Sequence, residues 1–125
     1  MKEIPVKAMD EKDLEFIDAL ERINVPRNVA RLITYLKDVR EAQSREIELA
    51  TGLRQPEVSI AMRTLREHGW INEREVKGPG KGRPMRFYAL RTPIEEIVKH
   101  YEEKARSESA RSMGAIKRLR ELSAT

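Results

Sequence analysis

Apolar residues recur at helical spacing in several stretches of this chain, separated by short segments rich in glycine, proline and polar residues. A period of 3.6 residues with a polar opposite face is typical of helices that pack on a core through one side. The first stretch begins after Asp10, a good N-cap, and the third, which Ser44 can cap, ends at Gly52. The pattern predicts four helices, over residues 10–23, 26–39, 44–51 and 55–68.

The pattern changes after Gly69. Residues 70–77 and 85–90 predict the two strands of a hairpin, the second carrying Phe87 and Tyr88, which are suited to strands. After Pro93 the helical spacing returns, is interrupted by a polar stretch over residues 102–112, and resumes as far as Leu122. This last segment fits either one long helix or two helices with a break near residues 107–114.

These elements predict a single domain over residues 1–125, since 125 residues suffice for one core. The predicted fold class is mainly α with a small β-hairpin wing, or α+β. Charged residues make up 37% of the chain and aromatic residues 5%, so we expect a small aliphatic core.

Two consecutive predicted helices have the spacing of a helix-turn-helix. The first holds Ile47 and Ala50 one turn apart, and Ala50 is small enough for the close approach of two helices. Gly52 permits the left-handed backbone that a tight turn requires. An ordinary helix hairpin would show the same local pattern, so the assignment depends on the second helix and on the hairpin after it.

The helix over residues 55–68 has a well-defined buried face made by Val58, Ala61, Met62 and Leu65, and Ile60 lies directly opposite. An isolated exposed isoleucine is common in proteins. Because serine, threonine and arginine surround it, we favour contact with thymine methyl groups in a DNA major groove. Gln55, at the N-cap position, is a poor cap but suits adenine recognition.

Charge is unevenly distributed along the chain. The formal net charge is +4, which suggests an anionic partner. Residues 77–91 contain five basic side chains and no acidic one, whereas residues 1–25 contain four basic and seven acidic ones. We expect the hairpin loop to contact an anion such as a phosphate backbone.

The stretch Ser-Arg-Glu-Ile-Glu-Leu-Ala-Thr-Gly-Leu-Arg-Gln-Pro-Glu-Val-Ser and the wing end Gly-Lys-Gly-Arg-Pro-x-x-x-Tyr-x-Leu carry a family resemblance. Over residues 26–91 the chain resembles the winged helix-turn-helix of MarR-type and TrmB-type transcription regulators, especially small archaeal ones. The resemblance implies a DNA-binding core over residues 26–91. Its expected recognition contacts are Ser44, Arg54, Gln55, Pro56, Ser59, Ile60 and Arg63. The expected wing contacts are Lys77, Lys81, Arg83 and Arg86.

Relatives of this kind imply flanking helices that form a dimer, here residues 10–23 and 93–122. The first helix has an unusually wide apolar face, and the last has a polar middle that needs an outside partner. The expected interface residues are Leu14, Phe16, Ile17, Leu20, Ile97, Tyr101, Ile116 and Leu119. A homodimer would read a near-palindromic double-stranded operator. No sugar-binding domain follows, so the sequence implies no inducer, and whether an effector ligand exists stays open.

The sequence lacks the residues that several classes of function require. The chain has no cysteine, and its two histidines lie in separate segments, which argues against a metal site or an enzyme. The glycine-rich loop matches no nucleotide-binding motif, so no cofactor is expected. No apolar run is long enough to span a membrane, and we expect a cytoplasmic, nucleoid-associated protein. Two alternatives to sequence-specific regulation are a winged-helix protein-interaction module of the transcription or replication machinery and a non-specific DNA-compacting protein.

Overall fold

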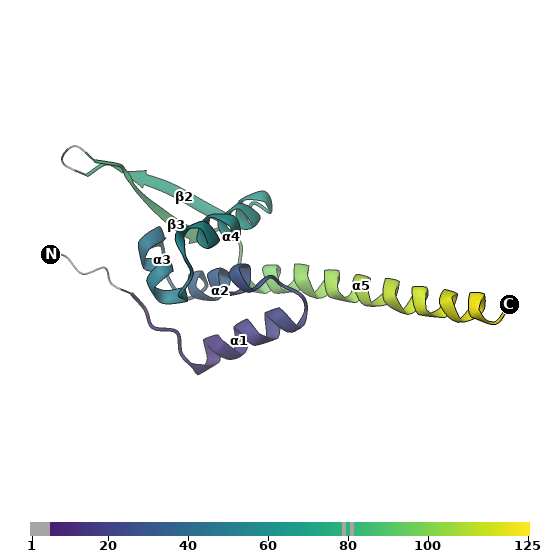
Figure 1. The fold of residues 1–125 in the computed structure, drawn as a ribbon. Coiled ribbons are helices and arrows are strands. Elements are labelled where there is room, and N and C mark those ends of the chain that lie inside the picture. The colour runs from purple at the N-terminus through teal and green to yellow at the C-terminus, as the bar shows by residue number, and fades with distance from the viewer. Residues whose placement is uncertain (1–5, 79, 81) are drawn as a thin grey trace.

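A computed structural model describes residues 6–78, 80 and 82–125. Figure 1 shows a body of short helices and strands from which one long helix extends. In chain order the elements are α1 (Glu11–Arg22), α2 (Arg27–Leu36), β1 (Ala42–Gln43), α3 (Ser44–Thr51), α4 (Gln55–Glu67), β2 (Ile71–Val76), β3 (Met85–Leu90) and α5 (Ile94–Ser123). We call residues 6–101 the body, residues 102–125 the arm, and residues 71–90 the wing.

The core is centred on α2, which packs against α1, α3 and α4. Leu32 and Ile33 of α2 are fully buried, together with Ile47 of α3 and Leu65 of α4. Complete burial of a side chain of this size contributes about 1.5–3 kcal/mol. The predicted buried face of α4 is confirmed, because Val58, Ala61, Met62 and Leu65 all lie in this core.

The helix boundaries follow the sequence signals in part. Asp10 caps α1, its side chain accepting a hydrogen bond from the Asp13 N–H at 2.9 Å. Gly52 closes α3 with φ of 73°, as predicted. Helix α2 ends at Leu36, three residues before the predicted end at Val39. There the hydrogen bonds tighten to three-residue spacing, with the Val39 N–H donating to the carbonyl of Leu36.

Two predicted caps are wrong by one residue. Gln43 takes the N-cap position of α3, and Ser44 is its first helical residue. The reason is that Gln43 has extended backbone and pairs with Phe87 of β3. In α4 the N-cap is Arg54 and Gln55 is helical, while the Glu57 carboxylate accepts a hydrogen bond from the Arg54 N–H at 3.0 Å.

The sheet has three antiparallel strands in the order β1-β3-β2, not only the predicted hairpin. Ile71 pairs with Leu90 at the base of the wing, and Val76 pairs with Met85 near its end. Strand β1 adds Ala42 opposite Tyr88. Because β1 leads directly into α3, this pairing ties the first helix of the helix-turn-helix to the wing.

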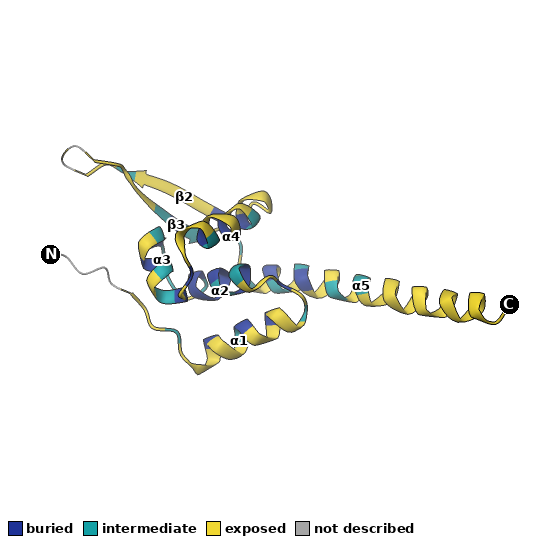
Figure 2. Cartoon of the chain, in the orientation of Figure 1, coloured by how far each residue is buried: buried dark blue, intermediate teal, exposed yellow. Residues whose placement is uncertain are grey.

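Helix α5 is a single helix of 30 residues, and no break forms near Gly114. Only Ile97 and Tyr101 of this helix are buried. Figure 2 shows the arm almost entirely in the exposed colour, and every residue from 109 onward is exposed. At about 1.5 Å per residue, α5 is about 45 Å long and carries most of its length away from the body.

Four aromatic rings join the connection between α4 and β2 to α5. His68 stacks on Trp70, with ring centroids 4.1 Å apart, and lies 4.8 Å from the ring of His100. Tyr101 completes the group beside Trp70 and His100. The two histidines, which lie in separate segments of the sequence, therefore meet in space where the arm leaves the body.

Candidate nucleic-acid interface

A groove of about 590 Å³ lies between α4 and the wing. Its lining comes from α4, from the wing and from the junction of β1 and α3. The groove residues are Gln43, Ser44, Gln55, Val58, Ser59, Met62, Arg63, Arg66, Glu75, Arg83, Pro84, Arg86 and Tyr88. Four arginines and one glutamate line this groove, so it is positively charged and suited to an anion.

One hydrogen bond within α4 orders part of its side of the groove. The Gln55 side-chain amide donates to the Ser59 hydroxyl at 3.0 Å, across one helical turn. This bond occupies one N–H of Gln55 and leaves its carbonyl oxygen and second N–H for another partner. Arg63, two turns along from Gln55, lies in the same groove.

Two of the groove arginines are held by carboxylates of β2. The Arg66 Nε lies 2.6 Å from Glu73 Oε1, and the Arg86 Nε lies 3.0 Å from Glu75 Oε1. The second ion pair raises the pKa of Arg86, so this guanidinium stays charged. Among the described residues Arg63 and Arg83 make no ion pair, and their charge faces the groove uncompensated.

The expected recognition residues do not all lie in this groove. Ser44, Gln55, Ser59 and Arg63 line it. Arg54, Pro56 and Ile60 are exposed on the start and outer face of α4, and Ile60 is 60% exposed. Those three residues are exposed and lie outside the groove lining.

The wing residues are similarly divided. Arg83 and Arg86 line the groove. Lys77 is exposed at the end of β2, and Lys81 lies outside the described residues. Arg66, Glu75 and Gln43 also line the groove, although the sequence did not single them out. Helical spacing does place Arg66 on the same flank of the exposed face as Ser59, two turns further along, although Arg66 was not among the expected contacts.

The expected dimer residues also separate into two groups. Ile17, Leu20, Ile97 and Tyr101 are buried in the core of a single chain, so they support the body and are not surface residues. Helical spacing could not tell these core positions from interface positions, because both are apolar. Phe16 is half-buried, whereas Leu14, Ile116 and Leu119 are exposed.

Over the described residues no cluster of three potential metal-ligating side chains forms, and no helix is both long and apolar enough to cross a membrane.

No protein-family model matches this sequence, and no curated protein matches it. Solved structures do. TrmBL2, an archaeal chromatin protein with a novel mode of DNA binding, is 19% identical with a TM-score of 0.50 over 90% of this chain. The match spans only 42% of TrmBL2, so this chain corresponds to less than half of that protein.

Two further structures match over nearly their whole length. A possible transcriptional regulator from Methanosarcina mazei Go1 is 14% identical with a TM-score of 0.53, covering 97% of this chain and 98% of that one. NadR, solved with 4-hydroxyphenylacetate, is 15% identical with a TM-score of 0.51, covering 98% and 91%. At this level of identity the likeness concerns the fold, and the predicted winged helix-turn-helix is confirmed.

Proposed function

We propose that this protein is a transcription regulator that binds double-stranded DNA as a homodimer. Helix α4 enters the major groove, and the wing lies on the phosphate backbone or in the minor groove. The observation that carries the proposal is the arginine-lined groove between these two elements, in which Arg63 and Arg83 have no ion-pair partner among the described residues. A protein-interaction module would not require positive charge on both walls.

The side chains of α4 have the chemistry needed to recognise bases. Gln55 can bond adenine through its free amide groups, and its bond to Ser59 restricts its rotamers before DNA arrives. Arg63 can bond guanine through two N–H groups. Ile60, the most exposed apolar side chain of α4, suits a thymine methyl group.

Dimer formation is supported by the arm. Leu119 is 62% exposed and Leu122 is 52% exposed, with Ile116 beside them on the stretch of α5 where every residue is exposed. Apolar side chains gathered at the end of a projecting helix are typical of an interaction surface. Two copies would present two α4 helices to a near-palindromic operator.

The proposal is tested by fluorescence anisotropy with labelled duplexes, using a selected site and random DNA. Log K should fall with log salt at about −0.9 per phosphate neutralised. Arg63→Ala should cost about 1–3 kcal/mol on the selected site and relax preference at one base pair.

Arg22→Ala is the matched control, because it removes the same charge from an exposed ion pair on α1, far along the chain from the groove. Arg22→Ala should leave DNA binding nearly unchanged. No binding at low salt would refute the proposal. Equal loss from Arg63→Ala on both duplexes would show that α4 is not the reader.

A second candidate function is non-specific DNA coating, as in a chromatin protein. Ile60 is the observation that bears on it, because an apolar side chain at the centre of the exposed face of α4 can touch a thymine methyl group but makes no hydrogen bond to a base edge, and so discriminates less than a polar side chain would. A selected site bound less than about ten times more tightly than random DNA would favour this candidate, since specific regulators show a ratio of about 10³–10⁷.

A further inference from the structure

The far end of the arm concentrates positive charge. Residues 109–125 hold four basic side chains and one acidic one, while the whole chain has a formal net charge of +4. Every residue of this stretch is exposed. Helix α1 holds five acidic and two basic side chains, and Figure 1 shows it on the opposite side of α2 from α4. The molecule is therefore polarised, with one acidic side at α1 and a basic end on the arm.

Three cations of the arm form one row. Lys104, Arg111 and Arg118 follow one another at intervals of seven residues, so the helix places them within about 40° of one another around its axis. His100 lies four residues before Lys104, at the start of the same row. Its ring centroid lies 5.2 Å from that of Trp70, in the connection between α4 and β2. The row therefore faces the side of the molecule that carries α4 and the wing.

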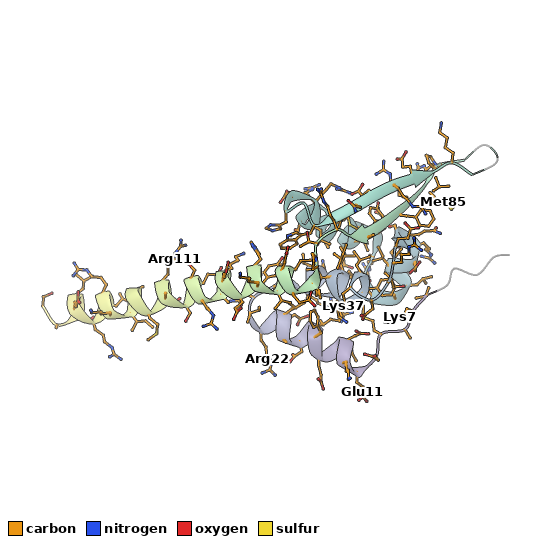
Figure 3. The ribbon with its side chains drawn as sticks, turned by 180° about the vertical axis from the view of Figure 1, so that it is seen from behind. Lys7, Glu11, Arg22, Lys37, Met85 and Arg111 are labelled. Carbon is orange, nitrogen blue, oxygen red and sulfur yellow. The ribbon has the colours of Figure 1, made fainter. Side chains whose placement is uncertain are left out.

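Figure 3 agrees with this placement. Arg111 lies on the edge of the arm toward the side of the wing, where Met85 is labelled, whereas Glu11 and Arg22 of α1 lie on the other side. The exposed face of α4 has the same orientation, because its buried face packs against α2. Figure 1 also shows the wing and the arm projecting from the body in opposite directions. A duplex held by α4 would thus meet the wing on one side and the arm on the other.

The charges of this row are available to an outside partner. Within the described chain neither Lys104 nor Arg111 makes an ion pair. Arg118 lies 3.2 Å from Glu121, but both side chains are more than half exposed, and a surface pair of this kind contributes little. A phosphate can therefore take the place of Glu121. Long cationic side chains without fixed partners suit phosphates better than base edges.

We propose that Lys104, Arg111 and Arg118 bind the phosphate backbone of the duplex that α4 contacts, on the side away from the wing. This contact rests on the DNA binding proposed above and adds a second backbone surface to it. At a rise of 1.5 Å per residue, the three cations lie roughly 6 to 27 Å beyond His100. They span roughly 21 Å, or about six base pairs at 3.4 Å each. Because Figure 1 shows the arm level with α2 and not with α4, the duplex bends toward the arm to reach it.

A row variant of the full chain, Lys104→Gln with Arg111→Gln and Arg118→Gln, tests the contact by fluorescence anisotropy. The probes are one half-site without flanks and the same half-site with about ten base pairs on each side. On the long duplex the slope of log K against log salt should become shallower by up to about 2.7, which is three phosphates at about 0.9 each. On the short duplex the row variant should bind like the original protein. An unchanged slope on the long duplex would overturn the arm contact alone, whereas failure of the original protein to bind either duplex would overturn the proposed function as well.

The matched control removes the same charge from another face of α5. Lys99, Arg106 and Lys117 are exposed and lie within about 20° of one another, more than 90° around the helix from the row. Lys99→Gln with Arg106→Gln and Lys117→Gln should leave the salt slope on the long duplex nearly unchanged. Equal shallowing in the control and the row variant would show a general effect of net charge and overturn the contact.

Tethered cleavage gives an independent measurement, because the chain has no cysteine of its own. Arg111→Cys on the arm and Met85→Cys on the wing, where Met85 is 44% exposed, each receive an iron chelate that cuts nearby DNA backbone. Position 85 should cut on one side of the half-site and position 111 on the other. Cuts from position 85 alone would overturn the arm contact while leaving the proposed function. Cuts from both positions at the same base pairs would also overturn it, since the arm would then lie on the side of the wing.

Discussion

The body and the arm use their apolar residues in opposite ways. In the body, Leu32 and Ile33 are fully buried against neighbouring elements of the same chain. In the arm, Leu119 and Leu122 are as regularly spaced but remain exposed. The same helical periodicity thus supports a core in one region and a free surface in the other. Periodicity shows that a face is apolar, and the tertiary contacts decide what covers that face.

The largest expected effect comes from making the arm polar at its tip. Leu119→Asp together with Leu122→Asp should dissociate the dimer, since two charges would replace the exposed leucines at the tip of the arm. The thermal unfolding of the body should change little. Apparent affinity for a two-half-site operator should fall about 10²–10⁴-fold, because the linkage of two binding modules is lost.

Light scattering and anisotropy measure these two effects. Met113→Asp is the matched control, because Met113 is exposed on the arm but lies on another face of the helix than Leu119 and Leu122. It should leave the dimer intact. If the double variant stays dimeric at micromolar concentration, the arm is not the dimer interface, and the exposed leucines of the arm do not serve assembly.

A single substitution in the core should instead lower the stability of the body, which a substitution in the arm should leave unchanged. Leu32→Ala removes a fully buried side chain and should lower the free energy of unfolding by about 2–5 kcal/mol. Leu119→Ala, measured in a chain kept monomeric by dilution, should change that free energy by less than about 0.5 kcal/mol. Urea unfolding followed by circular dichroism compares the two variants. Equal losses would mean that the arm contributes to the stability of the body.

A smaller effect is expected at the wing. Lys77 is exposed at the end of β2, where it suits a phosphate better than a base. Lys77→Ala should weaken binding to all duplexes alike and reduce the salt slope by about one. The change should be the same with the arm intact or disrupted, because this contact belongs to the wing. A loss confined to one DNA sequence would make Lys77 a reader of bases.

The smallest effect concerns acid stability of the contact between α1 and α2. Burial tends to raise the pKa of Asp13, but hydrogen bonds from the Asp10 N–H and the Lys37 ammonium outweigh it and hold this pKa below its usual value. A carboxyl with a lowered folded pKa stabilises the fold above its unfolded pKa, about 3.9. That stability is lost as pH falls through the folded pKa.

In the Asp13→Asn variant the free energy of unfolding should therefore fall less steeply as pH decreases than in the original protein. Urea midpoints at several pH values measure this difference. Asp18→Asn is the control, since Asp18 forms an exposed ion pair with Arg22 on the same helix. A variant of Asp13 whose acid profile matches the original protein would show that this carboxylate does not contribute.

The sequence predicted local structure well where one residue type decides the geometry. Asp10 begins α1, Gly52 ends α3, and the buried face of α4 follows from spacing alone. Strand β1 was not predicted, because two residues are too few to show an alternating pattern. Ala42 and Gln43 become a strand only through their partners Tyr88 and Phe87, which lie far along the chain.

The candidate site was predicted less completely, since it depends on contacts between distant segments. Ser59 and Arg63 were expected from one helix face, and they do line the groove. The pairing of Arg86 with Glu75 depends on strand register, which fixes these two residues as neighbours. Likewise, Ile17 and Tyr101 could not be assigned to the core until the packing of α1 and α5 was known.

The ring cluster at the base of the arm makes the junction between the body and the arm observable by fluorescence spectroscopy. Trp70 is the only tryptophan in the chain, so all indole emission comes from this point. Its stacked neighbour His68 has a lowered pKa, because burial and then the nearby charge of His100 disfavour its protonated form. The indole is therefore held against a neutral imidazole at physiological pH. Rotation of α5 relative to α4 would move His100 and Tyr101, whose ring centroids lie 5.2 Å and 5.6 Å from that of Trp70, and would therefore change the colour and lifetime of the fluorescence.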